Sequence, residues 1–352
     1  MKAVLVARDI APSNAFKMLA EKLPGSVLFV GSGKPLSVTE GEIAAAVKES
    51  DVVLLGMSSS FELATREREA GEAAYASNKP YGFYADTFGC AVTRAWFGPL
   101  RDNARFVFVL NESEAEKARE LYPNAKIVAS GNPTWDDFFY PKLTREESRA
   151  KLGIKDDETF VLCPGGKLLA INMQHWGMVL EALKHMSDYY GYSIRSWQAV
   201  FSRHPGDQSA PDAYAELVKF SDISAKVVAP DEMKSSDMIP GMDFMISCCS
   251  TVEIEAVCQR LPVVSYIPHT GQVRMRTTMG DKWEPVEQGV VIFSTPGCAF
   301  DLAAEICAIL EEDESIGALR LKQEELYPKP AERGLALGAI VSTLQEFAKR
   351  RN

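Results

Sequence analysis

The sequence predicts an α/β protein made of two units, each built around a parallel β-sheet that helices cover on both faces. Its 352 residues are about twice the length of a typical single domain, which has roughly 100–200 residues. Short apolar runs alternate with helical patterns along the whole chain, as they do in parallel sheets buried by crossover helices. Gly131, Pro133 and Pro141 interrupt residues 131–157, and this favours a connection between two units there.

In the first half, six apolar runs are predicted to be strands: Lys2–Ala7, Ser26–Val30, Asp51–Gly56, Tyr81–Tyr84, Arg105–Leu110 and Lys126–Ser130. The helices expected between them are Ala15–Lys22, Glu40–Glu49, Phe61–Ala76 and Ser113–Leu121. A Ser or Thr with a Glu three residues later predicts a capping box, in which each side chain satisfies a backbone amide of the other residue. The pairs that fit this pattern are Ser59/Glu62, Ser113/Glu116 and Thr144/Glu147.

The same alternation restarts in the second half, with strands expected near Thr159–Cys163, Trp197–Ser202, Lys226–Ala229, Asp243–Cys248, Pro262–Tyr266 and Val290–Phe293. We place the boundary at about residue 142. The expected units are therefore residues 1–142 and 143–330. A last amphipathic helix over residues 331–352 is expected to pack back across the connection.

The composition is that of an ordinary globular protein, with 46% apolar and 24% charged residues. No stretch reaches the roughly 18 apolar residues of a membrane-spanning helix. The apolar stretch in residues 1–10 is too short for a secretory signal. The simplest expectation is a cytoplasmic protein.

The charge distribution gives no strong sign of a nucleic-acid or membrane partner. Residues 1–150 carry 18 basic and 20 acidic side chains, and residues 151–352 carry 20 and 28, which makes a net charge of −10. Non-specific binding to nucleic acid needs a diffuse basic surface, whereas this chain is acidic in both parts. A local groove for a small anion is compatible with these counts.

The cysteines indicate neither a zinc site nor a disulfide framework, because no Cys-x-x-Cys occurs and their number is odd. Most of them lie inside apolar runs, so we expect reduced thiols in the core. The seven are Cys90, Cys163, Cys248, Cys249, Cys258, Cys298 and Cys307.

Ligands of open parallel sheets bind at the carboxyl ends of the strands, where backbone amides and helix N-termini point outward. The clearest candidate is residues 245–266, which are typical of a strand, a Ser/Thr turn, a short helix and a second strand. Ser250 is a natural N-cap, with Glu253 at the capping-box position. The amides that follow could bind a phosphate, and Glu255 could accept both hydroxyls of a ribose. A plain capped crossover, with Glu255 on a solvated flank, fits equally well.

This segment resembles a known signature. Ser250-Thr251, Glu255-Ala256 and Leu261–Val264 look like the S-T/G-x-x-x-E-A-x-x-x-G-x-P-V pattern in the nucleotide-binding domain of GT-B glycosyltransferases. The pattern is shared by their relatives, the non-hydrolysing UDP-N-acetylglucosamine 2-epimerases and the lipid A disaccharide synthases. One departure is that Leu261, preceded by Arg260, replaces the usual glycine before the Pro-Val step.

Three further segments follow the order of that superfamily, so the resemblance covers roughly residues 80–300. Ser130–Pro133 resembles the T-G-N-P motif that closes the N-terminal domain. Cys163–Lys167 resembles the glycine loop after the first strand of the second domain. Ser202–Pro205 resembles the K-x-H-P strand end.

The resemblance implies two facing Rossmann-like domains of GT-B type with a cleft between them. In the family the matched glutamate binds the nucleotide ribose and the matched Ser/Thr turn holds the diphosphate, which implies these roles for Glu255, Ser250 and Thr251. The glycine loop lets the backbone approach the phosphates closely, because glycine has no Cβ. The residues of that loop and of the matched strand end are Gly165, Gly166, Lys167 and His204. Lys167 could neutralise a leaving diphosphate or be a solvated loop lysine.

The acceptor side is expected in the first unit. Transfer to a hydroxyl needs a general base within hydrogen-bond reach. Asp86 follows a predicted strand and has a counterpart in lipid A disaccharide synthase-like enzymes, although it could equally cap the next segment. Asp9 and Glu62 are competing bases. The cations that could contact a phosphate or an anionic acceptor are Arg94, Arg274 and Arg276.

These observations predict a glycosyltransferase with a nucleotide-diphosphate sugar, most simply a UDP-sugar, as co-substrate and with an unidentified acceptor. No Asp-x-Asp occurs, so no metal or other cofactor is expected, and amides, helix N-termini and cations would meet the leaving charge. A non-hydrolysing 2-epimerase and a phosphotransferase for CDP-alcohols remain alternatives. A protein that closes on a small anion by hinge motion is the non-enzymatic alternative. A DNA-modifying glycosyltransferase fits the fold but not the charge.

Overall fold

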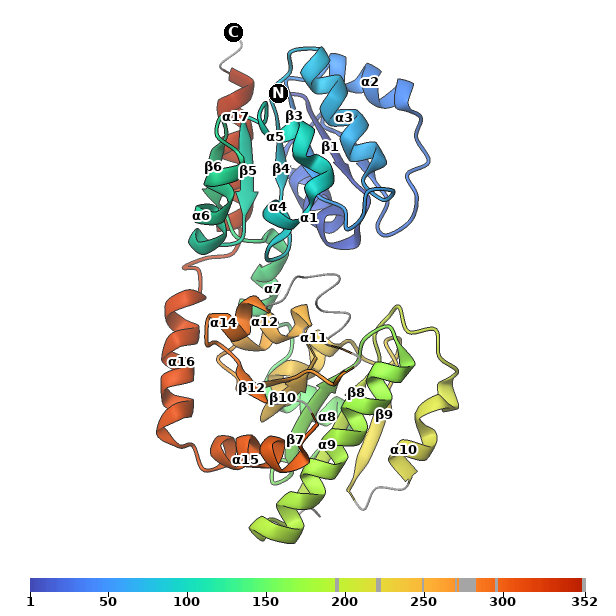
Figure 1. Cartoon of the computed structure of the whole chain (residues 1–352), viewed down its shortest axis with the longest axis vertical. Coiled ribbons are helices and arrows are strands. Elements are labelled where there is room, and N and C mark those ends of the chain that lie inside the picture. Colours follow the sequence, from blue (N-terminus) through green and yellow to red (C-terminus); the bar gives the residue numbers. More distant parts are fainter. Residues whose placement is uncertain are drawn as a thin grey trace. The chain divides into compact units, whose positions relative to one another are not determined.

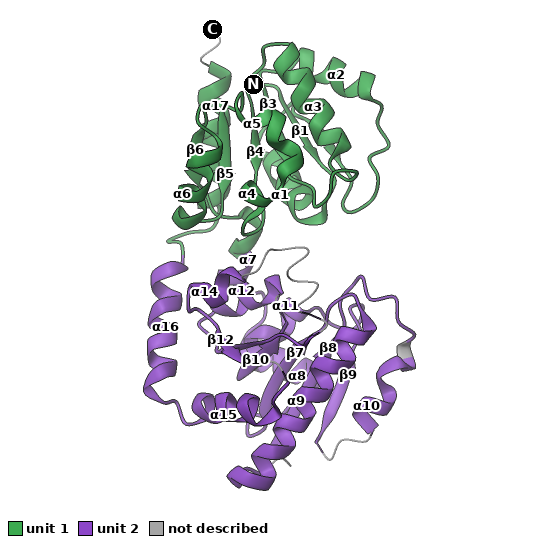
Figure 2. Ribbon diagram, viewed as in Figure 1, with its two compact units in different colours: residues 1–136, 330–352 green, residues 137–329 purple. Residues whose placement is uncertain are grey.

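The computed structural model describes residues 1–193, 196–219, 223–248, 250–269, 271, 283–294 and 297–349. The chain divides into two compact units, which are Met1–Asp136 with Pro330–Asn352 and Asp137–Lys329 (Figure 2). The chain therefore passes between the units twice, and helix α17 (Leu335–Lys349) belongs to the first unit. No described helix is long and apolar enough to cross a membrane.

The first unit contains a six-stranded sheet in the order β2-β1-β3-β4-β5-β6, in which the pairs are parallel (Figure 1). Its strands are β1 (Ala3–Ala7), β2 (Val27–Val30), β3 (Val52–Gly56), β4 (Tyr81–Tyr84), β5 (Phe106–Val109) and β6 (Lys126–Ala129). Its other helices are α1 (Ile10–Lys22), α2 (Glu40–Lys48), α3 (Thr65–Ala76), α4 (Cys90–Thr93), η1 (Ala95–Phe97), α5 (Gly98–Arg101), α6 (Glu112–Leu121) and η2 (Pro133–Trp135), with α7 (Asp136–Phe139) at the boundary.

Both faces of this sheet are buried, which explains why its strands are continuous apolar runs. One face packs against α2, α3 and α6, through side chains such as Ile43, Ala70 and Ala115. The other face packs against α1 and α17, and here Phe106 and Phe108 meet residues of α17 such as Ile340. The last helix is thus an integral part of the first core.

The second unit contains a six-stranded sheet in the order β12-β11-β10-β7-β8-β9, and its pairs are also parallel. Its strands are β7 (Thr159–Pro164), β8 (Trp197–Ser202), β9 (Ala225–Val228), β10 (Phe244–Ser247), β11 (Val263–Tyr266) and β12 (Ile292–Ser294). Its helices are α8 (Arg145–Leu152), α9 (Leu169–Tyr190), η4 (Pro211–Tyr214), α10 (Ala215–Lys219), α11 (Ser235–Met238), η5 (Ile239–Gly241), α12 (Thr251–Cys258), α14 (Glu284–Glu287), α15 (Ala299–Leu310) and α16 (Glu314–Leu326). The order reverses between β7 and β10, so a topological switch point lies there.

Of the predicted helix caps, the one at Thr144/Glu147 is confirmed as a full capping box at the start of α8. The predictions for Ser59/Glu62 and Ser113/Glu116 are wrong. Residues 61–64 form a turn, and α3 begins only at Thr65. Helix α6 begins one residue earlier than predicted, because the Asn111 side chain caps it by accepting from the Glu114 amide.

Candidate functional site

The predicted donor-binding segments follow three neighbouring strands of the second sheet, β10, β7 and β8. Residues 165–167 follow β7, Ser250 and Thr251 follow β10, and His204 follows β8. Because β7 pairs with both β10 and β8, the carboxyl ends of these strands meet at the switch point. Ligands of doubly wound sheets bind at this place.

The glycine loop after β7 is held by backbone and side-chain hydrogen bonds. The Gly165 amide donates to the Ser202 carbonyl at 2.8 Å. Asn172 brackets Gly166, since its Oδ1 accepts from the Gly166 amide at 2.7 Å and its Nδ2 donates to the Gly166 carbonyl at 3.0 Å. A Cβ on Gly165 would lie 2.7 Å from the buried Trp176 ring. Packing therefore explains this glycine, whatever its role toward phosphate.

A second network ties the loop after β8 to the same asparagine. Asn172 Nδ2 also donates to the Tyr214 hydroxyl at 2.8 Å, and that hydroxyl donates to Asp207 at 2.8 Å. Arg203 adds an ion pair to Asp207, with 3.2 Å between Nε and Oδ2. Spacing along the chain gives no sign of this network, because its members come from separate segments. They fix the two loops relative to each other.

His204 and Lys167 lie beside each other on these loops. The Gly206 amide donates to His204 Nδ1 at 2.8 Å, so the neutral ring carries its proton on Nε2 and can donate from there. Lys167 is exposed, and its Cε would be 3.3 Å from a Cβ at Gly206. The pair thus offers an imidazole N–H and an ammonium group near the switch point.

Helix α12 begins as predicted, with a capping box between Ser250 and Glu253. The Ser250 amide donates to Glu253 Oε1 at 3.2 Å, and the Trp283 indole donates to Oε2 at 2.7 Å. Ser265 also approaches Oε1, at 3.4 Å. Burial raises the pKa of Glu253 to about 7. This carboxyl is fully engaged as a cap, which confirms the structural role predicted for it.

Glu255 is different. It is 5% exposed, so a position on a solvated flank is ruled out. Burial raises its pKa to about 8, and the charges of Asp237 and Asp137 add to the rise. No residue that the structure describes makes a hydrogen bond or an ion pair with its carboxyl group. A buried carboxyl group without partners is costly, and the raised pKa keeps it neutral below about pH 8.

Counted from Glu255-Ala256, the glycine of the signature falls on Arg260 and not on Leu261 as expected. Arg260 has a φ of +61°, a left-handed conformation that usually favours glycine. Its guanidinium donates to the carbonyls of Val257 and Tyr327 at 2.9 and 2.7 Å. The turn before the Pro-Val step therefore has the geometry that glycine would allow. The predicted cations Arg274 and Arg276 lie outside the described residues.

In the first unit, the strand order reverses between β1 and β3. Asp9 follows β1, and its Oδ2 accepts from the Ser59 amide at 2.9 Å, so it bridges the two strand ends. Glu62 lies in the exposed turn before α3 and accepts from the Ser60 hydroxyl at 2.9 Å. Backbone and side-chain hydrogen bonds lower the pKa of Glu62, which makes it a weak base.

Asp86 follows β4, which is the strand next to β3. Burial raises its pKa to about 7, with a further rise from Asp9 and an opposing effect of Arg94. The Arg94 guanidinium donates to the Ser59 carbonyl at 3.4 Å and lies over the Trp96 ring. A partly exposed carboxyl with a pKa near 7 is suited to general base catalysis.

Glu67 on α3 is a buried carboxyl that was not predicted as a site residue. Its Oε1 accepts from the Arg8 amide at 3.0 Å and from the Ser58 hydroxyl at 2.5 Å. It thereby joins the ends of β1 and β3. Burial raises its pKa to about 7. A single Glu on a helix face gives no signal of such a role in the sequence.

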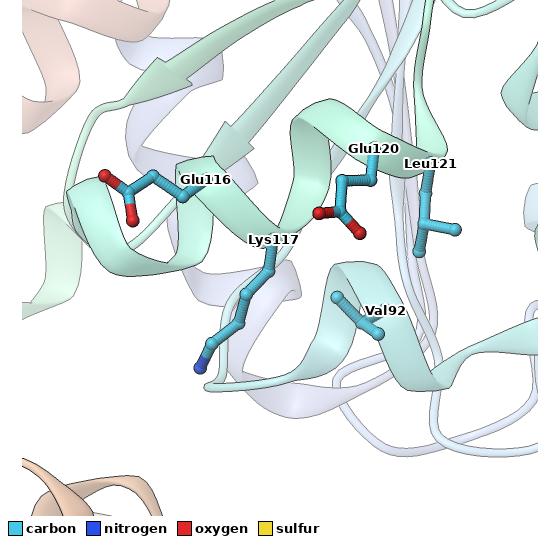
Figure 3. Close-up of a pocket in the computed structure, with 5 residues that line it drawn as sticks. All are labelled: Val92, Glu116, Lys117, Glu120 and Leu121. Carbon is cyan, nitrogen blue, oxygen red and sulfur yellow. The ribbon is translucent and has the colours of Figure 1, made fainter.

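A hollow of about 340 Å³ lies between α4 and α6 (Figure 3). Its walls are Val92, Glu116, Lys117, Glu120 and Leu121. Lys117 is paired with the buried Glu114, at 3.2 Å. Among the described residues, no group of three His, Cys, Asp or Glu side chains could hold a metal ion.

Comparison of the sequence gives no match to a protein-family model and no match among curated proteins. Comparison of the structure does give matches. The UDP-GlcNAc 2-epimerase from Neisseria meningitidis bound to UDP-GlcNAc is 15% identical, with a TM-score of 0.64 over 98% of this chain and 100% of that chain. A glycosyltransferase from Rickettsia africae is 13% identical, with a TM-score of 0.62 over 99% of both chains.

The wall teichoic acid polymerase TagF, in a structure soaked with CDPG, is 12% identical, with a TM-score of 0.58 over 99% of this chain and 90% of that chain. At such low identity these matches show the fold alone. The chain has the two-domain α/β fold of GT-B type that these enzymes share, which confirms the fold predicted from the sequence.

Proposed function

We propose that the protein is a glycosyltransferase that takes a sugar from a nucleotide-diphosphate donor, first of all a UDP-sugar, and passes it to a hydroxyl acceptor. The second unit binds the donor. The positive end of the α12 dipole, which follows β10, lies toward the diphosphate. Lys167 and His204 add an ammonium group and an N–H donor. The fold supports this class of donor, because one of its neighbours binds UDP-GlcNAc.

The observation that carries the proposal is the state of Glu255. Its carboxyl is almost completely buried and has no partner among the described residues. Two ribose hydroxyls donating to its two oxygens would remove the cost of burying it unpaired. Glu253, two residues earlier on the same helix, is fully occupied by its cap and by Trp283. The helix therefore offers one carboxyl for a ligand.

In the proposed reaction, Asp86 takes the proton of the acceptor hydroxyl as its oxygen forms a bond to the anomeric carbon of the sugar. The bond from that carbon to the diphosphate oxygen breaks, and the electron pair leaves with the nucleoside diphosphate. The N-terminus of α12 and Lys167 meet the charge that develops there. A base with a pKa of about 7 accepts this proton at neutral pH.

Binding of UDP tests the donor site. At pH 9, above the pKa of Glu255, we expect Glu255→Gln to weaken UDP binding by about 10–100-fold, because a hydrogen bond to a charged group contributes roughly 1.5–3 kcal/mol. Titration calorimetry with UDP measures this loss. The same titration of the wild type with CDP, GDP and TDP identifies the nucleobase that the site prefers. Glu324→Gln, at an exposed position of α16, is the matched control. Equal UDP affinity in Glu255→Gln and wild type would contradict the ribose assignment.

The 2-epimerase reaction is the second candidate, because several structural neighbours are UDP-GlcNAc 2-epimerases. The two reactions differ in their products. Incubation with UDP-GlcNAc alone, followed by proton NMR, would reveal a mass-neutral epimer if the protein is an epimerase. UDP release that depends on an added sugar or polyol acceptor would instead support the transferase. Stabilisation by the nucleotide sugar with neither product would favour the hinge-closing binding protein.

Removal of divalent metal is expected to leave turnover within about twofold. The chain has no Asp-x-Asp motif, and the proposed site meets the leaving charge with the N-terminus of α12 and Lys167. UDP release measured with excess EDTA, and again after Mg²⁺ or Mn²⁺ is added back, checks this expectation. Loss of turnover in EDTA with recovery on Mn²⁺ would contradict a metal-independent mechanism.

A further inference from the structure

The Ser130–Pro133 motif contributes no group to the proposed reaction. Its backbone nevertheless has a defined conformation at each residue from Gly131 to Pro133. The chain leaves β6 and turns at Gly131, whose φ of +76° favours glycine. Asn132 is then extended, and Pro133 begins η2, the helix position that proline suits best. This turn leaves the Asn132 side chain 5% exposed.

The amide group of Asn132 is held in one orientation. Its Oδ1 accepts from the Thr134 amide at 3.0 Å and from the Thr134 hydroxyl at 2.8 Å. With Oδ1 held by two donors, Nδ2 faces the other way and donates to the backbone carbonyl of Asp86 at 3.3 Å. The motif therefore reaches the residue that follows β4.

Other groups hold the rest of the loop that carries Asp86. The Gly89 amide donates to the buried Glu114 at 2.7 Å. The Phe88 ring lies 6.1 Å from the Trp135 ring of η2. At the carboxyl group itself, the Cys90 thiol is 4.0 Å from Oδ1, too distant for a strong hydrogen bond. The position of the carboxyl group thus depends on how its backbone is held.

We infer that Asn132 is a positioning residue, which holds the backbone of Asp86 so that its carboxyl group meets the acceptor hydroxyl. This inference rests on the proposed function, in which Asp86 is the general base. A small misplacement of a catalytic group is costly, because the reacting atoms must approach within about 3–3.5 Å in the correct orientation.

Two variants separate this role from a structural one. Asn132→Asp keeps the oxygen that Thr134 binds but replaces the donor facing the Asp86 carbonyl with a second acceptor. Thr134→Val removes the hydroxyl bond to Asn132 and leaves the contact with Asp86 in place. We expect Asn132→Asp to lower kcat about 10–100-fold and to shift the pH profile, with KM for UDP-GlcNAc within about twofold. Thr134→Val should retain the wild-type kcat within about threefold.

Hydrogen exchange provides a readout that does not need the reaction. We expect amide exchange in residues 86–93 to accelerate about tenfold in Asn132→Asp but not in Thr134→Val. Wild-type exchange and wild-type kcat in Asn132→Asp would overturn the inference. Asp86→Asn separates the assignment of Asp86 as the base from the positioning role of Asn132. If it retains full turnover, the base assignment fails and the role of Asn132 in catalysis fails with it; if it is inactive while Asn132→Asp is unaffected, only the positioning role fails.

Discussion

Asp86→Asn is expected to lower turnover by about 10²–10⁴-fold, which is the usual contribution of a general base. The carboxamide has nearly the same shape but cannot take a proton. The carboxyl group lies in the first unit, whereas the proposed nucleotide contacts lie in the second. UDP affinity should therefore stay within about twofold of the wild type, so that the loss appears in kcat.

The pH dependence of turnover is a second test of Asp86 as the general base. A base must be ionised to act, and the pKa of Asp86 is raised to about 7. We therefore expect wild-type turnover to rise with pH up to about 7 and then to level off. The residual activity of Asp86→Asn should not show this rise of turnover with pH. Initial rates at saturating substrate between about pH 5.5 and 9 measure it.

The control is Asp102→Asn, an isosteric change at an exposed position of the same unit. It should leave both kcat and UDP affinity at wild-type values. A full rate in Asp86→Asn together with a large loss in Asp9→Asn or Glu62→Gln would assign the base to that other carboxylate. The lowered pKa of Glu62 makes it the weaker candidate.

The free energy of unfolding is expected to fall as the pH rises from about 4.5 to 8.5. Burial raises the pKa of Glu67, Asp86 and Glu253 to about 7 and that of Glu255 to about 8. In the unfolded chain, such groups ionise near pH 4. Between the two values the folded protein binds more protons than the unfolded chain, so each step up in pH favours unfolding.

Glu255→Gln isolates the largest of these contributions. The carboxamide cannot ionise, so the variant lacks the loss of stability that this carboxyl group causes between about pH 4.5 and 8. We expect it to be more stable than the wild type by about 4–5 kcal/mol near pH 8.5 and nearly equal to it near pH 4.5, since one pKa unit corresponds to about 1.4 kcal/mol. Urea unfolding at both pH values, with Glu324→Gln as control, measures the difference. Equal stability of the variant and the wild type at pH 8.5 would contradict a raised pKa at this position.

The strands were largely predictable from the sequence, because strands buried on both faces are continuous apolar runs. Tyr81–Tyr84 and Trp197–Ser202 have their predicted bounds, and the ends of the others move by one or two residues. The start of α1 was missed, at Ile10 instead of Ala15. Pro12 and Ser13 are typical of a turn, but the first turn of a helix tolerates proline because it needs no backbone donor there.

The candidate site could be predicted only where its residues form a local pattern. Ser250 and Glu253 are three residues apart on one helix, and their box is confirmed. Glu67, Asn172 and Asn132 act through partners on separate loops, and spacing along the chain gives no sign of such contacts. Asn132 belongs to a motif that the sequence did indicate, but its contact with Asp86 depends on how β4 and β6 are placed in the sheet.

The sharing of the first core between two distant segments has a consequence for synthesis of the protein. Residues 137–329 are continuous in the chain, so the second unit can complete its core while translation continues. Phe106 and Phe108 are made early, yet their cover on α17 includes Leu337, Ile340 and Leu344. A growing chain therefore carries an uncovered aromatic sheet face until α17 has been synthesised and has left the ribosome. The first unit can complete its core only after the whole of the second unit has been made.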